Sequence, residues 1–265
     1  MHGVFTDQMN RQVFIAQPLQ RIVSLVPSQT ELLYDLGLNE EVVGITKFCI
    51  HPQQWFRSKT RVGGTKDFSV QKIVGLNPGL VIGNKEENTR QGIEELEKKL
   101  PVWMSDVQNL PDALAMIQQI GQLCGKTDTA LQISRQIQQR FNQIPKAQGQ
   151  RVLYLIWRNP FMAAGHNTFI HDMLTRVCGF TNALPHNAGR YPQIDAGLLR
   201  ELQPQVVMLS SEPYPFKPAH FAEIQEILPH AQVLPVNGEF FSWYGSRLLQ
   251  AAAYFKELAN RLYME

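Results

Sequence analysis

The sequence has few of the residues and patterns that mark several large protein classes. It contains only three cysteines in 265 residues, Cys49, Cys124 and Cys178, which are far apart and form no CxxC pair. A zinc site needs such a pair or a close alternation with histidine, so we expect none built on cysteine. We interpret the three thiols as small buried hydrophobic groups, and they do not decide the redox compartment.

Long apolar runs are also missing. No stretch reaches the roughly 20 apolar residues that cross a membrane, and residues 1–20 lack the apolar centre of a secretory signal. The 25 basic and 23 acidic residues are interspersed and leave a formal charge of +2, with no basic stripe that could follow a phosphate backbone. We therefore expect no nucleic-acid partner.

Motifs of covalent catalysis and phosphoryl transfer are absent as well. The sequence has no GxSxG elbow, Walker loop, HExxH helix or dinucleotide-binding glycine pattern, and Gly63 and Gly64 form an isolated pair. We expect a protein that is not an enzyme and that needs no catalytic cofactor.

The first hundred residues alternate between strand and helix patterns. Arg21–Pro27 is an apolar run of strand type, and a helix is predicted from Ser28, with Glu31 as its capping-box partner, to Gly37 as the residue after its end. Further strands are predicted over 42–46, 80–83 and 102–105, and a helix over 89–99.

The second half repeats this alternation after a helical stretch. Apolar residues recur at helical spacing from Leu110 to Ile144, with a break near Gly125, which predicts two helices, the second joining two lobes. Later strands are predicted over 151–157, 205–210 and 233–236, and helices over 169–179, 196–202, 220–228 and 246–263. The prediction is an α/β fold of two lobes, each with a central, mainly parallel sheet flanked by helices, joined by a long rigid helix. The predicted domains are residues 1–108, connecting helices 109–149, and residues 150–265.

A short internal repeat supports two related lobes. Residues 76–82 (LNPGLVI) and 202–208 (LQPQVVM) share the order of helix end, proline and strand, and Glu86 and Glu212 follow the two prolines at the same interval. This spacing predicts both carboxylates on corresponding loops at the carboxyl ends of strands, where ligands of open α/β sheets bind. The loops at these ends are rich in aromatic, histidine and arginine side chains, which suit a large, flat, partly anionic ligand.

Several stretches resemble one known family. RIVSLVPSQTELLYDLGL (21–38), VVGIT (42–46) and RVGGTKDFSVQKIVGLNPGLVIG (61–83) are similar to the N-terminal lobe of the class III periplasmic binding proteins, which have a rigid helical backbone. The similarity is weaker over 198–209 and returns at SWYGSRLL (242–249). The resemblance implies a receptor that holds cobalamin, a ferric siderophore, haem or a metal ion between its lobes and delivers it to an ABC permease.

Within that family, the chain is most similar to the cobalamin-binding branch. In that branch an aromatic residue follows the strand at the position of KFCIHP (47–52) and a tryptophan lies near SWYGSR, which Trp243 matches. His51 stands where the branch can carry tyrosine; it is either an axial ligand to cobalt or haem iron or a residue that hydrogen-bonds the loop backbone. His166 either contacts a propionate or corrin amide or has a structural role, and Trp157 is predicted to stack on the ligand. The predicted ligand-binding residues are His51, Trp157, Arg158, His166, Tyr191, Trp243, Tyr244 and Arg247. Trp55 and Trp103, in helix and strand patterns, are expected to be packing residues.

The resemblance also implies partners. Family members dock on permease arginines through acidic side chains, for which Glu86, Glu87 and Glu212 are candidates by position; the alternative is that they are ordinary solvated loop carboxylates. We expect a monomer that binds a small-molecule metal chelate such as cobalamin and the transmembrane subunits of an ABC permease. A periplasmic or cell-surface location follows from the resemblance, and a cytoplasmic one stays open because this chain carries no signal.

Two other function classes remain. Chelatases of tetrapyrrole synthesis have a similar two-lobed architecture, and four histidines could converge to hold a metal, although no two have the i, i+4 spacing of a preset pair: His51, His166, His171 and His186. The second alternative is a cytoplasmic ligand-binding protein without a transporter.

Overall fold

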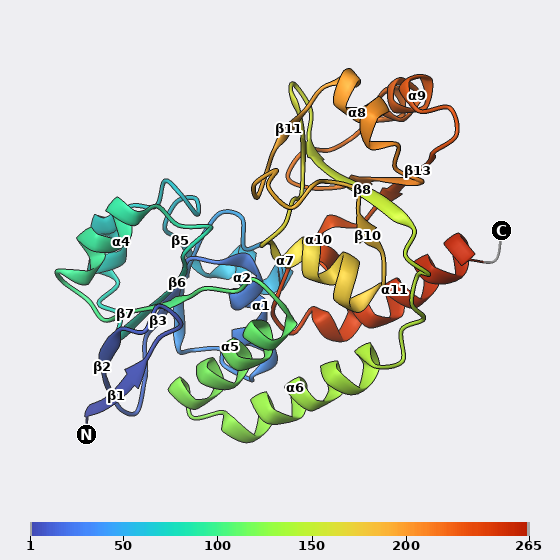
Figure 1. The fold of residues 1–265 in the computed structure, drawn as a ribbon. Coiled ribbons are helices and arrows are strands. Elements are labelled where there is room, and N and C mark those ends of the chain that lie inside the picture. Colours follow the sequence, from blue (N-terminus) through green and yellow to red (C-terminus); the bar gives the residue numbers. More distant parts are fainter. Residues whose placement is uncertain (1, 264–265) are drawn as a thin grey trace. The chain divides into compact units, whose positions relative to one another are not determined.

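The computed structural model describes residues 2–263, and the chain divides into two compact units. Unit 1 comprises Met1–Val107, Pro111–Ile137 and Trp243–Leu248, and unit 2 comprises Gln108–Leu110, Gln138–Ser242 and Leu249–Glu265. Each unit has its own parallel or mainly parallel sheet with helices packed on it (Figure 1). The predicted fold class is confirmed at this level.

Unit 1 is built on a five-stranded sheet. Its strands are β3 (Ile22–Ser24), β4 (Val42–Ile45), β5 (Thr60–Arg61), β6 (Leu80–Asn84) and β7 (Val102–Ser105). They lie in the order β5-β4-β3-β6-β7, and every neighbouring pair is parallel. Parallel strands covered on both faces are apolar throughout rather than alternating; β6, buried at all five positions, follows this rule.

Short helices follow the strands of unit 1. They are α1 (Pro27–Asp35), α2 (Gln53–Ser58), α3 (Val70–Gly75) and α4 (Arg90–Glu97). Ile73 of α3 and Ile93 of α4 pack with Val23 and Val81 of the sheet in one buried cluster. The sequence did not predict α2, α3 or an N-terminal antiparallel hairpin of β1 (His2–Thr6) and β2 (Gln12–Ala16).

The predicted start of α1 is wrong, and its predicted end is right. The helix begins at Pro27, with Val26 as N-cap and no capping side chain, so Ser28 lies inside the helix. Proline suits the first helical position because its φ is preset and it has no N–H to satisfy. Gly37, just after the helix, has a φ of +79°, the left-handed conformation that glycine adopts most readily there.

Two longer helices follow, α5 (Leu110–Leu123) and α6 (Thr127–Phe141), which confirms the predicted helix pair. Gly125, with a φ of +67°, ends the first of them. A Cβ on Gly121 would lie 2.2 Å from the Cβ of Ala130, so this close approach of α5 and α6 requires glycine. The boundary between the units falls inside α6, after Ile137.

Unit 2 contains the second sheet. Its strands are β8 (Arg151–Trp157), β9 (Phe161–Ala163), β10 (Thr181–Asn182), β11 (Gln193–Ile194), β12 (Val206–Ser210) and β13 (Gln232–Val236). The order is β11-β9-β8-β12-β13, with β10 pairing β8. The pairs that β8 forms with β10 and β12 are parallel, as is the β12–β13 pair, whereas β9 joins β8 and β11 antiparallel.

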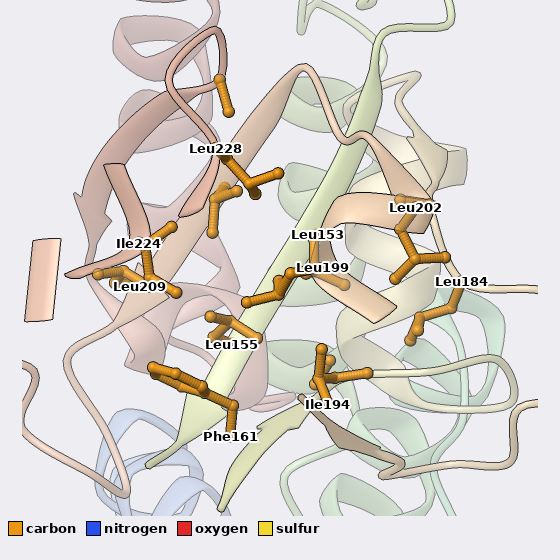
Figure 2. Close-up of a cluster of buried hydrophobic side chains, with 14 residues drawn as sticks. Leu153, Leu155, Phe161, Leu184, Ile194, Leu199, Leu202, Leu209, Ile224 and Leu228 are labelled. Carbon is orange, nitrogen blue, oxygen red and sulfur yellow. The ribbon is translucent and has the colours of Figure 1, made fainter. Parts of the chain in front are cut away.

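Helices pack on this sheet to form the core of unit 2. They are α7 (Phe169–Asp172), the π-helix η1 (Met173–Val177), α8 (Ala196–Leu202), α9 (Pro218–Ile227), α10 (Gly238–Ser242) and α11 (Leu248–Tyr263). Figure 2 shows Leu153 and Leu155 of β8 meeting Leu199 of α8 and Ile224 of α9 in a buried apolar cluster. The helix predicted over 169–179 is therefore found, but its second half has π-helical hydrogen bonding.

The internal repeat is real in the structure. Asn77 and Gln203, which precede the two prolines, have nearly equal left-handed φ angles of 45° and 42°. β6 and β12, which follow the prolines, each lie second from the end of their sheet. Glu86 and Glu212 both come two residues after these strands, as predicted.

The remaining sequence predictions concern cysteine, tryptophan and membrane spans. None of the three cysteines forms a disulfide; Cys49 and Cys178 are buried and Cys124 is partly exposed. Trp55 and Trp103 are buried at 1% and 0% exposure, as expected of packing residues. Within residues 2–263, no helix combines the length and the apolar character needed to pass through a bilayer.

Candidate ligand-binding site

The loop between β4 and α2 in unit 1 turns apolar side chains outward. The thiol of Cys49 is buried, with its Sγ 3.1 Å from the hydroxyls of Thr30 and Thr46, and burial raises its pKa. Its neighbours Phe48 and Ile50 are 50% and 43% exposed. The inward thiol thus fixes a loop that presents an apolar surface at the carboxyl end of a parallel strand, where ligands of α/β sheets bind.

The segment Trp243–Leu248 belongs to unit 1, where Arg247 pairs with Glu31, a residue 216 positions earlier in the chain. Nε and Nη2 of Arg247 donate to the two carboxylate oxygens of Glu31 at 2.8 and 2.7 Å. Both side chains are almost wholly buried, and the guanidinium lies 4.8 Å from the ring centroid of Trp243. Burial raises the pKa of Glu31, an effect that the Arg247 charge opposes. Glu31 is therefore an ion-pair partner, not the capping-box residue that the sequence predicted.

Two further contacts complete this group. The hydroxyl of Tyr244 donates to Oε1 of Glu87 at 2.7 Å, and burial, reinforced by the Glu87 charge, raises the pKa of Tyr244 well above its ordinary value. The His51 ring meets the Trp243 ring edge-on, with centroids 5.6 Å apart. The structure thus brings together four of the eight predicted ligand-binding residues, namely His51, Trp243, Tyr244 and Arg247; we call them the unit 1 cluster.

In unit 2, Trp157 and Arg158 lie at the end of β8. Trp157 is 40% exposed and its ring centroid is 5.5 Å from that of Tyr214. Arg158 forms two hydrogen bonds of 2.7 Å with Glu223, and its guanidinium lies 5.3 Å from the ring centroid of Phe161. Trp157 therefore has open ring surface, whereas the Arg158 charge already has a carboxylate partner.

His166 lies in a stack of three histidines in unit 2. Its ring centroid is 4.4 Å from that of His171 and 4.3 Å from that of His186. Its Nε2 lies 3.0 Å from the carbonyl oxygen of Leu184 and must carry a hydrogen, because a carbonyl only accepts. We call these three residues the histidine stack.

The amide of Asn182 determines the protonation of His171. Its Oδ1 accepts from the backbone N–H of Leu184, and its Nδ2 donates to the carbonyl of Ala164, so the orientation of the amide is fixed. Nδ2 also lies 3.2 Å from Nδ1 of His171, which must therefore be the acceptor and carry no hydrogen. Burial, with the His166 charge, lowers the pKa of His171, in agreement with a neutral ring.

Tyr191 lies in the loop between β10 and β11. The Arg190 guanidinium is 5.9 Å from its ring centroid, and Tyr191 is half-buried in the loop before β11. Among residues 2–263, no three side chains of histidine, cysteine, aspartate or glutamate are arranged to hold a metal ion. The convergence considered for four histidines is thus found for three of them within unit 2, as neighbouring rings tilted against one another, while His51 belongs to unit 1.

Of the three predicted docking residues, two have hydroxyl partners. Glu86 is exposed, and Glu87 is half-buried and bound to Tyr244. Glu212 is half-buried, and the hydroxyl of Ser242 lies 2.7 Å from its Oε1.

Some site residues were not singled out from the sequence. Phe48 and Ile50 are exposed beside His51, and their signal was present in the apolar character of a loop directly after a strand. Glu31 had the right charge to pair with an arginine, but nothing in the sequence connects it with Arg247. Tyr214 packs against Trp157 from an aromatic-rich loop, but nothing in the sequence distinguishes it from the other aromatic residues of that loop.

Comparison with known proteins gives consistent results. Residues 22–229 match the model of a family described as periplasmic binding protein. The vitamin B12-binding protein of Pectobacterium carotovorum subsp. carotovorum (strain PC1) is 24% identical over 241 residues, which cover 88% of this chain and 86% of the relative.

Solved structures share the fold. A periplasmic vitamin B12 binding protein of Vibrio cholerae superposes with a TM-score of 0.78 at 19% identity, over 94% of this chain and 99% of that one. A periplasmic haem-binding protein of the same species gives a TM-score of 0.77 at 20% identity, over 92% and 99%.

Proposed function

This chain belongs to the periplasmic binding protein family, and from that premise we propose that it is the substrate-binding protein of an ABC importer. Its cargo is cobalamin or a related metal chelate: another corrinoid, haem or a ferric siderophore. The protein holds the chelate unaltered and delivers it to a permease. The relatives named above as vitamin B12-binding and haem-binding proteins support this class of cargo.

The observation that carries most weight is the unit 1 cluster beside exposed Phe48 and Ile50. A corrin or porphyrin is a large, flat, mainly apolar ring with polar substituents, and it needs apolar surface with a few placed polar groups. Phe48 and Ile50 offer that surface, and His51 adds an imidazole beside it. We propose His51 as a ligand contact that can coordinate cobalt or iron in its neutral form, with Trp243, Tyr244 and Arg247 behind it.

In unit 2 we propose four ligand contacts, Trp157, Arg158, His166 and Tyr191. Trp157 fits the role best because 40% of it is exposed and an indole stacks well on flat rings. The guanidinium of Arg158 pairs with Glu223, and we propose that it also binds carboxylate or amide substituents of the ligand. His166 and Tyr191 contribute polar edges from loops that follow β9 and precede β11.

The partners follow from the same proposal. Permease transmembrane subunits bind the acidic loops that carry Glu86, Glu87 and Glu212, and of these three Glu86 is the exposed one. The protein acts as a monomer in the periplasm or at the cell surface, without catalysis, and with residues 1–108 and 150–265 as lobes that the connecting helices 109–149 join.

A ligand titration tests the function. Purified protein is mixed with cyanocobalamin, dicyanocobinamide, haemin and several ferric siderophores, and visible absorbance is followed. We expect one of these classes to bind with a spectral shift and to be recovered unchanged, with His51→Ala altering the shift and Phe14→Ala, an exposed aromatic residue on β2, leaving it unaffected. Failure of every chelate to bind contradicts the proposal, and insertion of metal into a free macrocycle would identify a chelatase instead.

A further inference from the structure

Two carboxylates hold the residues that flank Trp243 in the chain. In unit 2 the hydroxyl of Ser242 lies 2.7 Å from Oε1 of Glu212, and in unit 1 the hydroxyl of Tyr244 donates to Oε1 of Glu87 at 2.7 Å. The two glutamates come from the loops after β12 and β6, which are equivalent strands of the internal repeat. Hydroxyl-to-carboxylate bonds of this length are among the stronger ones, because the acceptor is charged.

The backbone of both loops is held from within. The N–H groups of Glu86 and Glu87 donate to Oδ1 of Asn84, at 2.8 and 3.1 Å, and the N–H of Glu212 lies 3.4 Å from Oγ of Ser210. Asn84 and Ser210 are the last residues of β6 and β12 and are buried. The carboxylates therefore project from loops that are tied to the sheets. Each one can thus hold the hydroxyl group that it binds in a fixed position.

A third carboxylate holds the other end of the segment. Glu31 binds Arg247 through two hydrogen bonds, and the same guanidinium covers the Trp243 ring at 4.8 Å. The Trp243 ring in turn meets the His51 ring edge-on. Within unit 1, contacts thus run from Glu31 through Arg247 to the Trp243 ring and on to His51. Glu87 and Glu212 hold Tyr244 and Ser242, the chain neighbours of Trp243.

We propose that Glu31, Glu87 and Glu212 are positioning residues that set the Trp243 ring and, through it, the His51 imidazole that faces the ligand. The inference rests on the proposed function, in which His51 contacts the chelate. A ring held in place before binding loses less conformational entropy when the ligand arrives, so the contacts raise affinity without touching the ligand. Glu87 and Glu212 then act on ligand affinity within the protein, in addition to the proposed docking of their loops on the permease.

The hydroxyl of Tyr244 is suited to this role. It is buried, and its pKa is raised by burial first and by the Glu87 charge second, so the proton stays on the oxygen and the group remains a donor. A carboxylate can accept that hydrogen and has no hydrogen of its own to compete.

The test removes the acceptor and the donor separately. Glu87→Ala and Tyr244→Phe are each expected to weaken binding of cyanocobalamin or haemin by about threefold to tenfold, the range for a hydrogen bond to a charged group that acts at one remove. The double variant should lose no more affinity than the single variant with the larger loss, because both substitutions remove the same hydrogen bond. Glu87→Gln, which keeps an acceptor oxygen, should recover part of the affinity. Glu212→Ala and Ser242→Ala form the equivalent pair in unit 2.

A ligand-free readout separates positioning from general stability. The indole N–H resonance of Trp243, assigned by its loss in Trp243→Phe, should shift or broaden in Glu87→Ala and in Glu212→Ala, while that of the fully buried Trp103 stays in place. The matched control is Glu95→Ala, which removes an exposed carboxylate from α4 of unit 1 and should change neither resonance nor affinity.

The outcomes distinguish the two proposals. If the wild-type protein binds no chelate, the proposed function fails, and the Trp243 resonance still decides whether the glutamates position the ring. If the wild type binds and Glu87→Ala and Glu212→Ala keep both its affinity and its Trp243 resonance, the positioning role is refuted. Normal affinity and resonance together with lost transport would assign the same glutamates to permease docking and would also overturn the inference.

Discussion

The candidate side chains of unit 1 and unit 2 are held by different kinds of interaction. In unit 1, Arg247 and Tyr244 are bound to the carboxylates of Glu31 and Glu87; the first pair is almost wholly buried and the second is partly buried. In unit 2, His166 rests in the histidine stack, and Arg158 pairs with Glu223 where both side chains are partly exposed. Carboxylates and guanidinium groups ordinarily keep their charge at neutral pH, whereas imidazole changes its charge between about pH 5 and 8. We therefore expect the Glu31–Arg247 pair of unit 1 to keep its charges at ordinary pH values and the histidine stack of unit 2 to respond to pH.

The largest expected effect is the loss of the buried ion pair. Arg247→Ala leaves the Glu31 carboxylate without a partner in a site where Arg247 and Glu31 side chains are 8% and 11% exposed. Removal of one member of such a pair costs about 3 kcal/mol of unfolding free energy, since the remaining charge is stranded. Urea unfolding followed by circular dichroism measures it.

The control for this change is Arg135→Ala, which removes an exposed arginine from α6 of unit 1 and should leave stability within about 0.5 kcal/mol. A double change, Glu31→Gln with Arg247→Met, should be less destabilising than Arg247→Ala, because no charge is left behind. Equal stability of Arg247→Ala and the wild type would mean that the pair adds nothing to unit 1.

The second effect concerns ligand binding by the two tryptophans. Trp243→Ala should weaken chelate binding by about 1 to 3 kcal/mol, because it removes an aromatic anchor and the support of His51. Trp157→Ala removes the more exposed indole, at 40% against 8% for Trp243. Isothermal titration of both variants shows which unit contributes more; an unchanged affinity in Trp243→Ala removes that residue from the site.

The third effect is a pH dependence of the histidine stack in unit 2. The pKa of His171 is lowered from 6.5, first by burial and then by the His166 charge, with His186 acting in the same direction and Asp172 against it. Below about pH 6.5 His171 is protonated in the unfolded chain, whereas the folded protein disfavours the protonated ring. The contribution of His171 to the stability of unit 2 is therefore fully present above that pH and is lost as the pH drops below it. A protonated His171 would also point an Nδ1 hydrogen at the Asn182 amide hydrogens, which loosens the Leu184 segment.

Amide hydrogen exchange at several pH values, compared at matched intrinsic rates, measures this effect. Protection of residues 182–186 should fall with pH, while β3 and β6 of unit 1 stay protected. His171→Asn keeps an acceptor for Asn182 and does not titrate, so it should abolish the difference, whereas His230→Gln, at an exposed histidine of unit 2, should not. Equal pH responses in both units would remove the contrast between them.

Local patterns account for most of the fold. The apolar runs of β6 and β12 are buried throughout and were recognisable as strands. The left-handed residues before Pro78 and Pro204 lie where a helix ends just ahead of a proline, a pattern that the sequence also showed. The hairpin β1–β2 was missed because its outward Val4 and Phe14 are apolar and exposed, so the two strands show no alternation of apolar and polar residues. Strand β5 has only two residues, too few to show a pattern.

The site was less accessible to sequence reasoning, because its contacts join distant positions. Resemblance and loop position selected Trp243 and His51, but the pairing of Arg247 with Glu31 spans 216 residues. Glu31 fits a capping box equally well by spacing, and only the packed structure shows that Pro27 starts the helix and that the carboxylate meets a guanidinium. Spacing within a helix constrains neighbours three or four residues apart and says nothing of a segment that returns from the far end of the chain.

The smallest expected effect concerns the more exposed ion pair, which lies in unit 2. Arg158 and Glu223 are joined by two hydrogen bonds, but their side chains are 22% and 34% exposed, so water competes for both charges and salt screens them. Arg158→Ala should therefore cost only about 0.2 to 1 kcal/mol of unfolding free energy, and the loss should shrink further at high salt. Urea unfolding at low and high sodium chloride, with Arg200→Ala of α8 as the exposed control, gives the measurement. A loss as large as that of Arg247→Ala would show that exposure does not separate the two ion pairs, because the same bidentate geometry would then stabilise equally in buried and in solvated surroundings.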